Sequence, residues 1–395
     1  MLSQPSEGRN ITQTHATQSA FNNAHHLNAF DGVRGLLAVW VYLGHVANAV
    51  GFHQYVLAAH ALAVDFFMIL SGFLMIHTWK ADLHVHPFNL KTTLRFYIAR
   101  FFRIAPLYYL LLLVCYLALP TLSLMQAAAL KAIPPPWATT IANYAPAIGW
   151  NFDSLQWLLL HLSFGFGLVP GMEASTPLPD WSLSLEMQFY LVLPLLIVLF
   201  ARTPIILLAT ASALLAVAAP AWFGNYLEAG SVAHFGQPSV LAYRLNAFVA
   251  GMLIGYFLKK RAAQPTEGLS RHNLYLIVCV AICVAPLSKP VILGFFCLGA
   301  LALWRIPFAT AILSVKGLRQ LGDVSYSVYL SHLLIVIPAM YWLIQDTGFM
   351  TQSPIWRFVI TVAITAPIIF LLSYLLNKTI EQPGIKLGRW LAKRV

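Results

Sequence analysis

Two ionisable side chains share one face of the first long apolar segment of the chain. Arg34 and His45 are eleven residues apart, and eleven steps of about 100° return a helical side chain to nearly the same direction. With a rise of about 1.5 Å per residue, they lie about 16 Å apart along the axis. Arg34 can be a snorkelling anchor, and His45 a buried imidazole bonded to a backbone carbonyl. The alternative is a cationic binding group and an acid–base imidazole in one site.

Two carboxylates inside apolar segments are candidates to work with that imidazole. Asp65 falls at about the depth of His45, where it could fix the imidazole tautomer or bond a Ser or Tyr hydroxyl on a neighbouring helix. Glu186 is the only carboxylate between Asp180 and Glu228, and we expect it in the first turn of its helix. The helix dipole stabilises an acid there, so Glu186 has a structural as well as a catalytic interpretation.

An Arg-x-x-Arg pattern, Arg100 and Arg103, precedes the third apolar segment. Residues i and i+3 share a helix face, so both guanidinium groups could make bidentate hydrogen bonds to one phosphorylated ligand. Contact with anionic lipid headgroups is the other interpretation.

Metal and disulfide chemistry are not predicted. The pairs His25-His26 and His84-Val-His86 lie in polar segments without a third ligand, whereas a metal site usually needs three or four. The cysteines all lie in apolar runs, as small buried hydrophobes do: Cys115, Cys279, Cys283 and Cys297.

Composition decides what kind of element carries these residues. Of 395 residues, 59% are hydrophobic and 9% charged, the net charge is +11 and the mean hydropathy is +0.73. A basic soluble protein that binds nucleic acid would then expose far too much apolar surface, and a disordered chain would be much less hydrophobic. The sequence therefore predicts an all-α polytopic membrane protein.

Eleven apolar segments are long enough to be considered as spans. They are Phe30–Val50, Leu57–His77, Phe102–Ala118, Leu155–Val169, Ser184–Phe200, Pro204–Ala219, Ala242–Leu258, Leu274–Pro286, Val291–Arg305, Val324–Ile344 and Trp356–Leu376. Lys and Arg concentrate on the cytoplasmic side of membrane proteins. All basic groups fall on one side only if Leu155–Val169, which is short and contains glycines, does not span. We therefore predict about ten transmembrane helices with both termini cytoplasmic, and a re-entrant or interfacial element at Leu155–Val169.

The span count also divides the chain. Residues 1–28 are predicted to be a polar cytoplasmic tail, because they lack the apolar core of a signal peptide. Residues 29–380 form the membrane domain, with an outer loop at about 120–180, and residues 381–395 a basic cytoplasmic tail.

Six motifs, taken in order, resemble those of the membrane acyltransferase 3 family. They are Phe30-Asp-Gly-Val-Arg-Gly with His45, Asp65-Phe-Phe-Met-Ile-Leu-Ser-Gly-Phe73, Arg100-Phe-Phe-Arg-Ile-Ala-Pro106, Trp181-Ser-Leu-Ser-Leu-Glu186 with Phe189-Tyr190, Ser325-Tyr-Ser-Val-Tyr-Leu-Ser-His332, and Glu381-Gln-Pro383. Members of this family O-acylate carbohydrates of bacterial envelopes. The resemblance implies ten spans, a place in the bacterial inner membrane, cytoplasmic acyl-CoA (usually acetyl-CoA) as donor, a carbohydrate acceptor on the far side, and no tightly bound cofactor or metal.

The resemblance also assigns roles to the candidate residues. Arg34, Arg100 and Arg103 would hold the phosphates of acyl-CoA, and His45 would act as general base or carry the acyl group covalently. Glu186 and Asp65 would orient the acceptor or the imidazole. Two positions depart from the family pattern: Met187 replaces a common second acid, and Ser331 replaces the aromatic residue before His332, so a role for His332 stays open.

Aromatic residues of the outer loop, among them Trp137, Tyr144, Trp150 and Trp157, offer surface for a glycan. They could equally be membrane-interface residues.

A transporter or flippase of a glycolipid or acyl carrier is the alternative function. It would use the same intramembrane charges as a substrate or proton path. A third possibility is a scaffold for envelope glycan assembly, which would tolerate loss of Arg34. Beyond donor and acceptor, membrane lipid is the expected partner, and nucleic acid is not.

Overall fold

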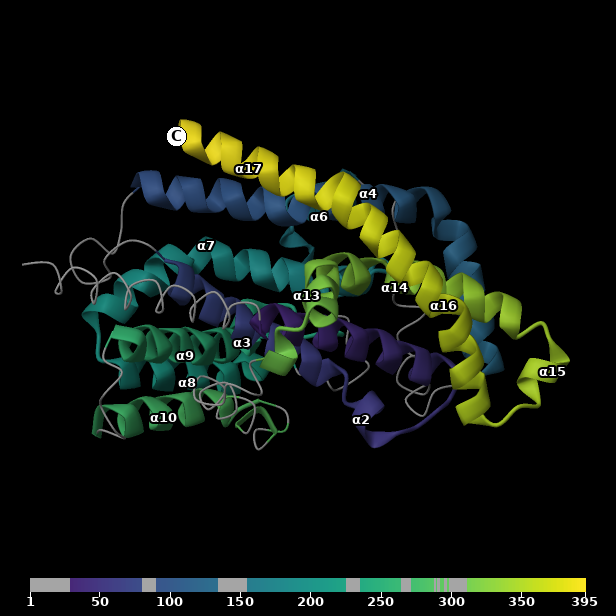
Figure 1. The fold of residues 1–395 in the computed structure, drawn as a ribbon, viewed down its shortest axis with the longest axis horizontal. Coiled ribbons are helices and arrows are strands. Elements are labelled where there is room, and N and C mark those ends of the chain that lie inside the picture. Colours follow the sequence, from purple (N-terminus) through teal and green to yellow (C-terminus); the bar gives the residue numbers. More distant parts are fainter. Residues whose placement is uncertain are drawn as a thin grey trace, which may run out of the picture.

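The computed structural model describes residues 29–79, 90–133, 155–224, 235–263, 271–287, 289, 292–294, 297 and 311–395. All regular structure in these ranges is helical, as predicted (Figure 1). The helices are an N-terminal helix (residues 29–49), α2 (Tyr55–Ala58), α3 (Ala61–Thr78), α4 (Leu90–Ala132), α6 (Leu155–Leu162), α7 (Trp181–Arg202), α8 (Ile205–Phe223), α9 (Leu245–Ala263), α10 (Arg271–Val284), α13 (Lys316–Asp323), α14 (Ser325–Leu343), α15 (Thr347–Met350), α16 (Pro354–Leu376) and α17 (Gln382–Arg394). Short turns of other helix types are η1 (Gly165–Leu168), η2 (Met172–Ala174), η3 (Leu241–Tyr243) and the π-helix η4 (Asn377–Glu381).

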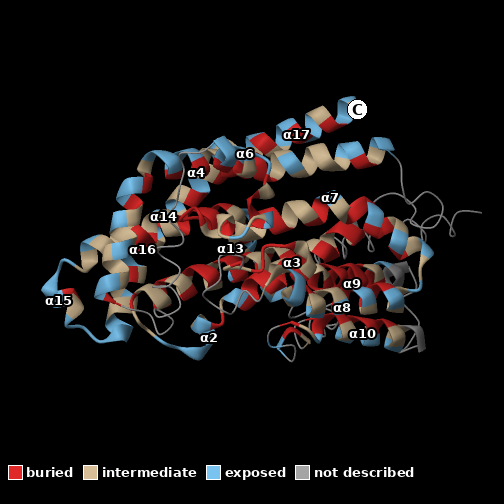
Figure 2. Ribbon diagram, turned by 180° about the vertical axis from the view of Figure 1, so that it is seen from behind, coloured by how far each residue is buried: buried red, intermediate tan, exposed pale blue. Residues whose placement is uncertain are grey.

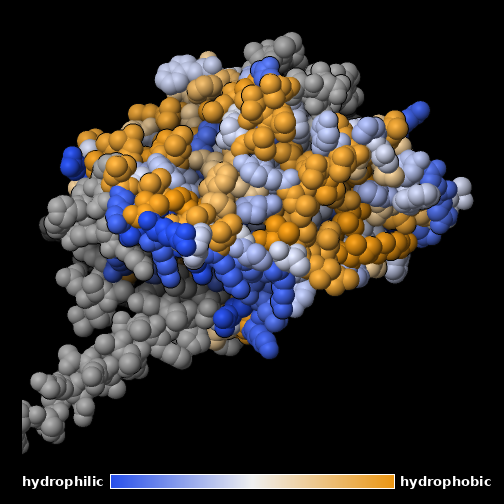
Figure 3. Space-filling model, turned by 90° about the horizontal axis from the view of Figure 1, so that it is seen from above, coloured by the Kyte–Doolittle hydropathy of each residue, from blue (hydrophilic) through white to orange (hydrophobic). Residues whose placement is uncertain are grey.

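Several of these helices can cross a membrane. In the described ranges, five are long and apolar enough: Leu90–Ala132, Trp181–Arg202, Ile205–Phe223, Ser325–Leu343 and Pro354–Arg394. Figure 3 shows hydrophobic side chains over broad areas of one face, with hydrophilic ones gathered in separate zones. This surface suits a multi-pass membrane protein. The count of ten spans and the side of the termini stay predictions, and most of Val291–Arg305 lies outside the described residues.

Helix α4 is much longer than the expected segment Phe102–Ala118. Its 43 residues correspond to about 65 Å, roughly twice a bilayer core. Arg100 and Arg103 therefore lie inside the helix and not at its start. Pro106 and Pro120 interrupt its hydrogen bonds, and Figure 1 shows its later part turning away from α17.

The basic C-terminal segment expected as a tail is helical. After the π-helix η4, α17 packs along α4 (Figure 1). Gly384 and Gly388 permit this close contact, because a Cβ at Gly388 would lie 2.5 Å from the Cβ of Phe102. The C-terminus is thus part of the packed structure.

The main hydrophobic core is built mostly by residues of α3, α4, α7 and α9, with smaller contributions from the N-terminal helix, α8, α10 and α14. Figure 2 shows buried residues concentrated along α3 and α9, which pack backbone to backbone because side chains at Gly72 and Gly251 would overlap the facing main chain. Such close packing of small residues is common between membrane helices.

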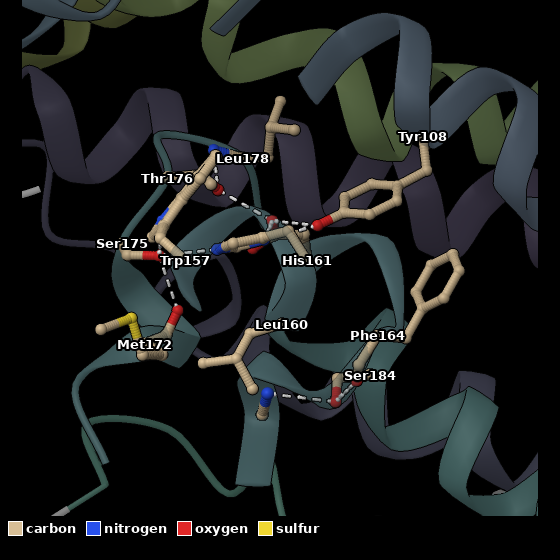
Figure 4. A network of polar contacts seen from close by, with 12 residues as sticks. Tyr108, Trp157, Leu160, His161, Phe164, Met172, Ser175, Thr176, Leu178 and Ser184 are labelled. Atoms are coloured by element: carbon tan, nitrogen blue, oxygen red, sulfur yellow. Dashed lines mark hydrogen bonds and ion pairs between the residues drawn. The ribbon is translucent and has the colours of Figure 1, made fainter. Parts of the chain in front are cut away.

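A buried polar network holds the start of α7 (Figure 4). The hydroxyl of Tyr108 lies 2.8 Å from Nδ1 of His161 and 3.3 Å from Oδ2 of Asp180, and Nε2 of His161 lies 2.9 Å from Oγ of Ser175. Trp157 donates to the same Ser175 hydroxyl and is 1% exposed. Trp157 therefore cannot offer the glycan surface expected of it; Trp137, Tyr144 and Trp150 lie outside the described residues. Helix α6 has eight residues, about 12 Å, which is too short to cross a bilayer.

The His161–Asp180 pair contributes two opposing effects to the pH dependence of stability. Both lie outside the membrane-spanning helices. Burial raises the pKa of Asp180 to about 7 and lowers the pKa of His161 to about 3. Between about pH 4 and 6, Asp180 is protonated in the folded protein and ionised in the unfolded chain, so its contribution to the free energy of unfolding falls as the pH rises. His161 is neutral in the folded protein and protonated in the unfolded chain, so its contribution rises. For each residue the free energy of unfolding changes by about 1 kcal/mol per pH unit, and the two changes have opposite signs.

Replacing one of the two residues at a time should show the pH dependence that the other one causes. We expect the thermal midpoint of Asp180→Asn in detergent to rise between about pH 4 and 6, and that of His161→Gln to fall. The wild type is the control, and its profile should lie between those of the two variants. Identical profiles for the three proteins would contradict this account.

Candidate active site

Three of the predicted cationic residues meet in one cavity. Arg34 from the N-terminal helix and Arg100 and Arg103 from α4 line a cavity of about 100 Å³ together with Glu186 from α7. Its other walls come from α3, α9 and α14: Val64, Phe67, Met68, Leu70, Ser71, Leu74, Met75, Phe248, Ser325, Tyr326 and Tyr329, with Ile104, Ser182, Leu183 and Tyr190 from α4 and α7.

The charges of this cavity favour an anion. Nη1 of Arg34 lies 3.3 Å from Oδ1 of Asp31, and the guanidinium of Arg100 lies 5.5 Å and 5.7 Å from the ring centroids of Phe96 and Tyr190. Three guanidinium groups thus face a space to which Glu186 contributes one carboxylate. Fixed positive charge between apolar walls attracts an anionic ligand strongly, because little water screens it.

Glu186 is held in place by hydroxyl groups. Its Oε1 accepts a hydrogen bond of 3.1 Å from Ser71 and another from Tyr190. Helix α7 begins at Trp181, earlier than predicted, so Glu186 stands in the second turn. The helix-dipole explanation of its position, which needs the first turn, is therefore wrong.

His45 lies outside this cavity, in contact with two other histidines. Nδ1 of His45 is 2.9 Å from Nε2 of His332, and its ring centroid is 4.7 Å from that of His60. Nδ1 of His332 is 2.7 Å from the carbonyl oxygen of Tyr329, which can only accept. In neutral His332 the Nε2 atom is then an acceptor, so His45 donates from Nδ1. Nε2 of His45 therefore carries a lone pair, as a base or nucleophile requires.

Helix α14 joins the cavity to the histidine pair. Tyr329 lines the cavity and packs against Phe67, with ring centroids 6.0 Å apart. His332, one turn further along α14, contacts His45. The N-terminal helix shows the same order, with Arg34 at the cavity and His45 further along. The cationic cavity and the imidazole base are thus neighbours along two helices.

Asp65 forms a buried ion pair with an arginine. Its Oδ1 forms an ion pair of 2.8 Å with Nε of Arg244, and both side chains are largely buried. This partner is a cation from the turn before α9, which the sequence did not predict; the contacts proposed for Asp65 with the imidazole or with a Ser or Tyr hydroxyl stay predictions. Asp65 therefore belongs to the packing of α3 against α9.

Two residues of the site were not assigned a role from the sequence. His332 lies in a motif, and His60 lies inside the second predicted apolar segment, where any ionisable group is a functional candidate. That signal was available for His60. Within the described ranges, no three His, Cys, Asp or Glu side chains are arranged to hold a metal ion.

Comparison with known proteins decides the family. A family model described as an acyltransferase domain matches residues 27–374. The chain belongs to this acyltransferase family. The predicted resemblance is thereby confirmed, and the protein is a membrane enzyme that transfers an acyl group from a donor to an acceptor.

Two relatives of this acyltransferase differ in how much they share with it. This acyltransferase is 26% identical over 363 residues to the "Putative membrane-bound transacylase BcsY" of Komagataeibacter xylinus, and the match covers 90% of this chain and 82% of that protein. It is 31% identical over 118 residues to "Nose resistant to fluoxetine protein 6" of Caenorhabditis elegans, covering 23% of this chain and 14% of that protein. No solved structure matches.

Proposed function

We propose that the acyltransferase moves an acyl group, acetyl by preference, from acyl-CoA to a hydroxyl of a cell-envelope or exported carbohydrate. The observation that carries this proposal is the meeting of Arg34, Arg100 and Arg103 in one cavity beside the His45–His332 pair. Guanidinium groups bind phosphates bidentately, and acyl-CoA bears several phosphates on one end and its thioester on the other.

The proposed orientation follows from this polarity. The arginines hold the phosphates at the cytoplasmic mouth of the cavity, and the pantetheine arm passes Tyr329 and Phe67 towards His45. The carbohydrate enters from the other side of the bacterial inner membrane, with both chain termini in the cytoplasm. Nε2 of His45 acts on the thioester or on the acceptor hydroxyl, and Glu186 keeps Tyr190 and Ser71 in place around the donor.

The decisive assay follows the acyl group. Membranes containing the wild type are incubated with acetyl-CoA labelled in the acetyl group and a host glycan extract, and base-labile ester is counted. Label in ester supports acyl transfer. A transporter of glycolipid or acyl carrier would form no ester, so absence of label from the wild type would contradict the proposal.

The donor site is tested separately with Arg103→Gln. Loss of a charge-assisted hydrogen-bonding group typically costs about 1.5–3 kcal/mol, so we expect the KM for acetyl-CoA to rise about 10- to 100-fold. Arg95→Gln is the matched control, because Arg95 is an exposed arginine of the same helix that does not line the cavity; its KM should be unchanged. Equal effects of both substitutions would indicate general surface charge instead of a phosphate site.

A further inference from the structure

His60 is placed against His45 by the backbone of the N-terminal helix. A Cβ at Gly44 would overlap the Cβ and Cγ of His60, so only glycine lets this ring approach. The two imidazoles then lie with centroids 4.7 Å apart and planes inclined by 58°. His60 immediately precedes α3 and follows the exposed segment that contains His53 and Tyr55.

The tautomer of His60 is set by its own turn. Its Nδ1 lies 2.9 Å from the carbonyl oxygen of Leu57, which can only accept, so Nδ1 carries the proton and Nε2 the lone pair. An ordinary imidazole is mostly uncharged at pH 7. A half-buried neutral imidazole with a defined lone pair thus stands beside the base of the active site.

We propose that His60 is the general base for the acceptor hydroxyl, acting on an acyl group carried by His45. This proposal rests on the proposed function. Once Nε2 of His45 is acylated, it has no lone pair with which to take a proton, and a second base is needed for the acceptor. Among the described residues, two histidine rings contact His45. His332 already holds Nδ1 of His45 in a hydrogen bond, so His60 is the one left to act as a base.

The steps balance as follows. Nε2 of His45 bonds to the acyl carbon, the C–S bond breaks, and the electron pair leaves with the CoA thiolate, which takes a proton from water. The Nδ1 proton of acylated His45 stays in its hydrogen bond to Nε2 of His332. Nε2 of His60 then takes the proton of the acceptor hydroxyl, the oxygen bonds to the acyl carbon, and the C–N bond breaks. The electron pair of that bond returns to Nε2 of His45, whose Nδ1 has kept its proton, and His60 releases its proton to water.

Two assays separate the two half-reactions. Exchange of labelled CoA into unlabelled acetyl-CoA, without acceptor, reports acylation of His45; transfer of labelled acetyl to glycan extract or to water reports deacylation. We expect His60→Gln to keep exchange within about twofold of the wild type and to lower both transfers about 10²-fold or more. Gly44→Ala, which displaces the ring, should do the same.

The controls keep the outcomes distinct. His53→Gln, on the same exposed segment, should leave exchange and transfer unchanged, and His45→Ala should lose both. Normal transfer by His60→Gln, or equal loss of exchange and transfer, would overturn the proposal. Ester formation without exchange in the wild type would overturn it while leaving the proposed function intact, and absence of both activities from the wild type would instead contradict the proposed function.

Discussion

Replacement of His45 by alanine is expected to lower the rate of acyl transfer by about 10²–10⁴-fold, the usual contribution of a positioned acid–base side chain. The reason is that Nε2 of His45 carries the reactive lone pair. The KM for acetyl-CoA should change little, because the arginines that bind its phosphates line a separate cavity. The rate at saturating acetyl-CoA and the KM are measured in the labelled-ester assay.

His332 provides the matched test of how that lone pair is held. His332→Leu removes the acceptor of the His45 Nδ1 proton and should lower the rate nearly as far, since the wrong tautomer of a catalytic histidine is costly. His332→Gln should recover much of the activity, because its amide oxygen can accept the same hydrogen bond. Equal activity of the Leu and Gln variants would show that His332 only fills space.

Breaking the Asp65–Arg244 pair should have the largest effect on stability. Removing one partner of a buried ion pair leaves the other charge uncompensated, which typically costs about 3–5 kcal/mol. Asp65→Ala and Arg244→Met should each lower the free energy of unfolding by this order, as measured by denaturation in detergent.

The double substitution is the control for this pair. Asp65→Leu with Arg244→Met removes both charges and should restore most of the stability, because no buried charge is left alone. Additive losses would contradict a direct pairing. If Asp65→Ala is as stable as the wild type but has lost activity, Asp65 acts in catalysis and not in stabilising the fold.

The sequence predictions that are confirmed rest on patterns that are local in the chain. Composition predicted an all-α membrane protein, because a chain this apolar can satisfy its backbone in lipid only by regular hydrogen bonding. Motif order predicted the family. The spacing of Arg34 and His45 predicted that one helix carries both, and the structure places both in the N-terminal helix.

Contacts between helices were decided by the tertiary structure. His45 and His332 are 287 positions apart, and helical periodicity cannot tell which faces of distant helices meet. For the same reason the sequence left open whether Asp65 faces His45 or a Ser or Tyr hydroxyl, and only the tertiary structure shows its ion pair with Arg244. Sequence patterns identified the charged groups that cost energy in a membrane; packing decided which of them compensate one another and which face a ligand.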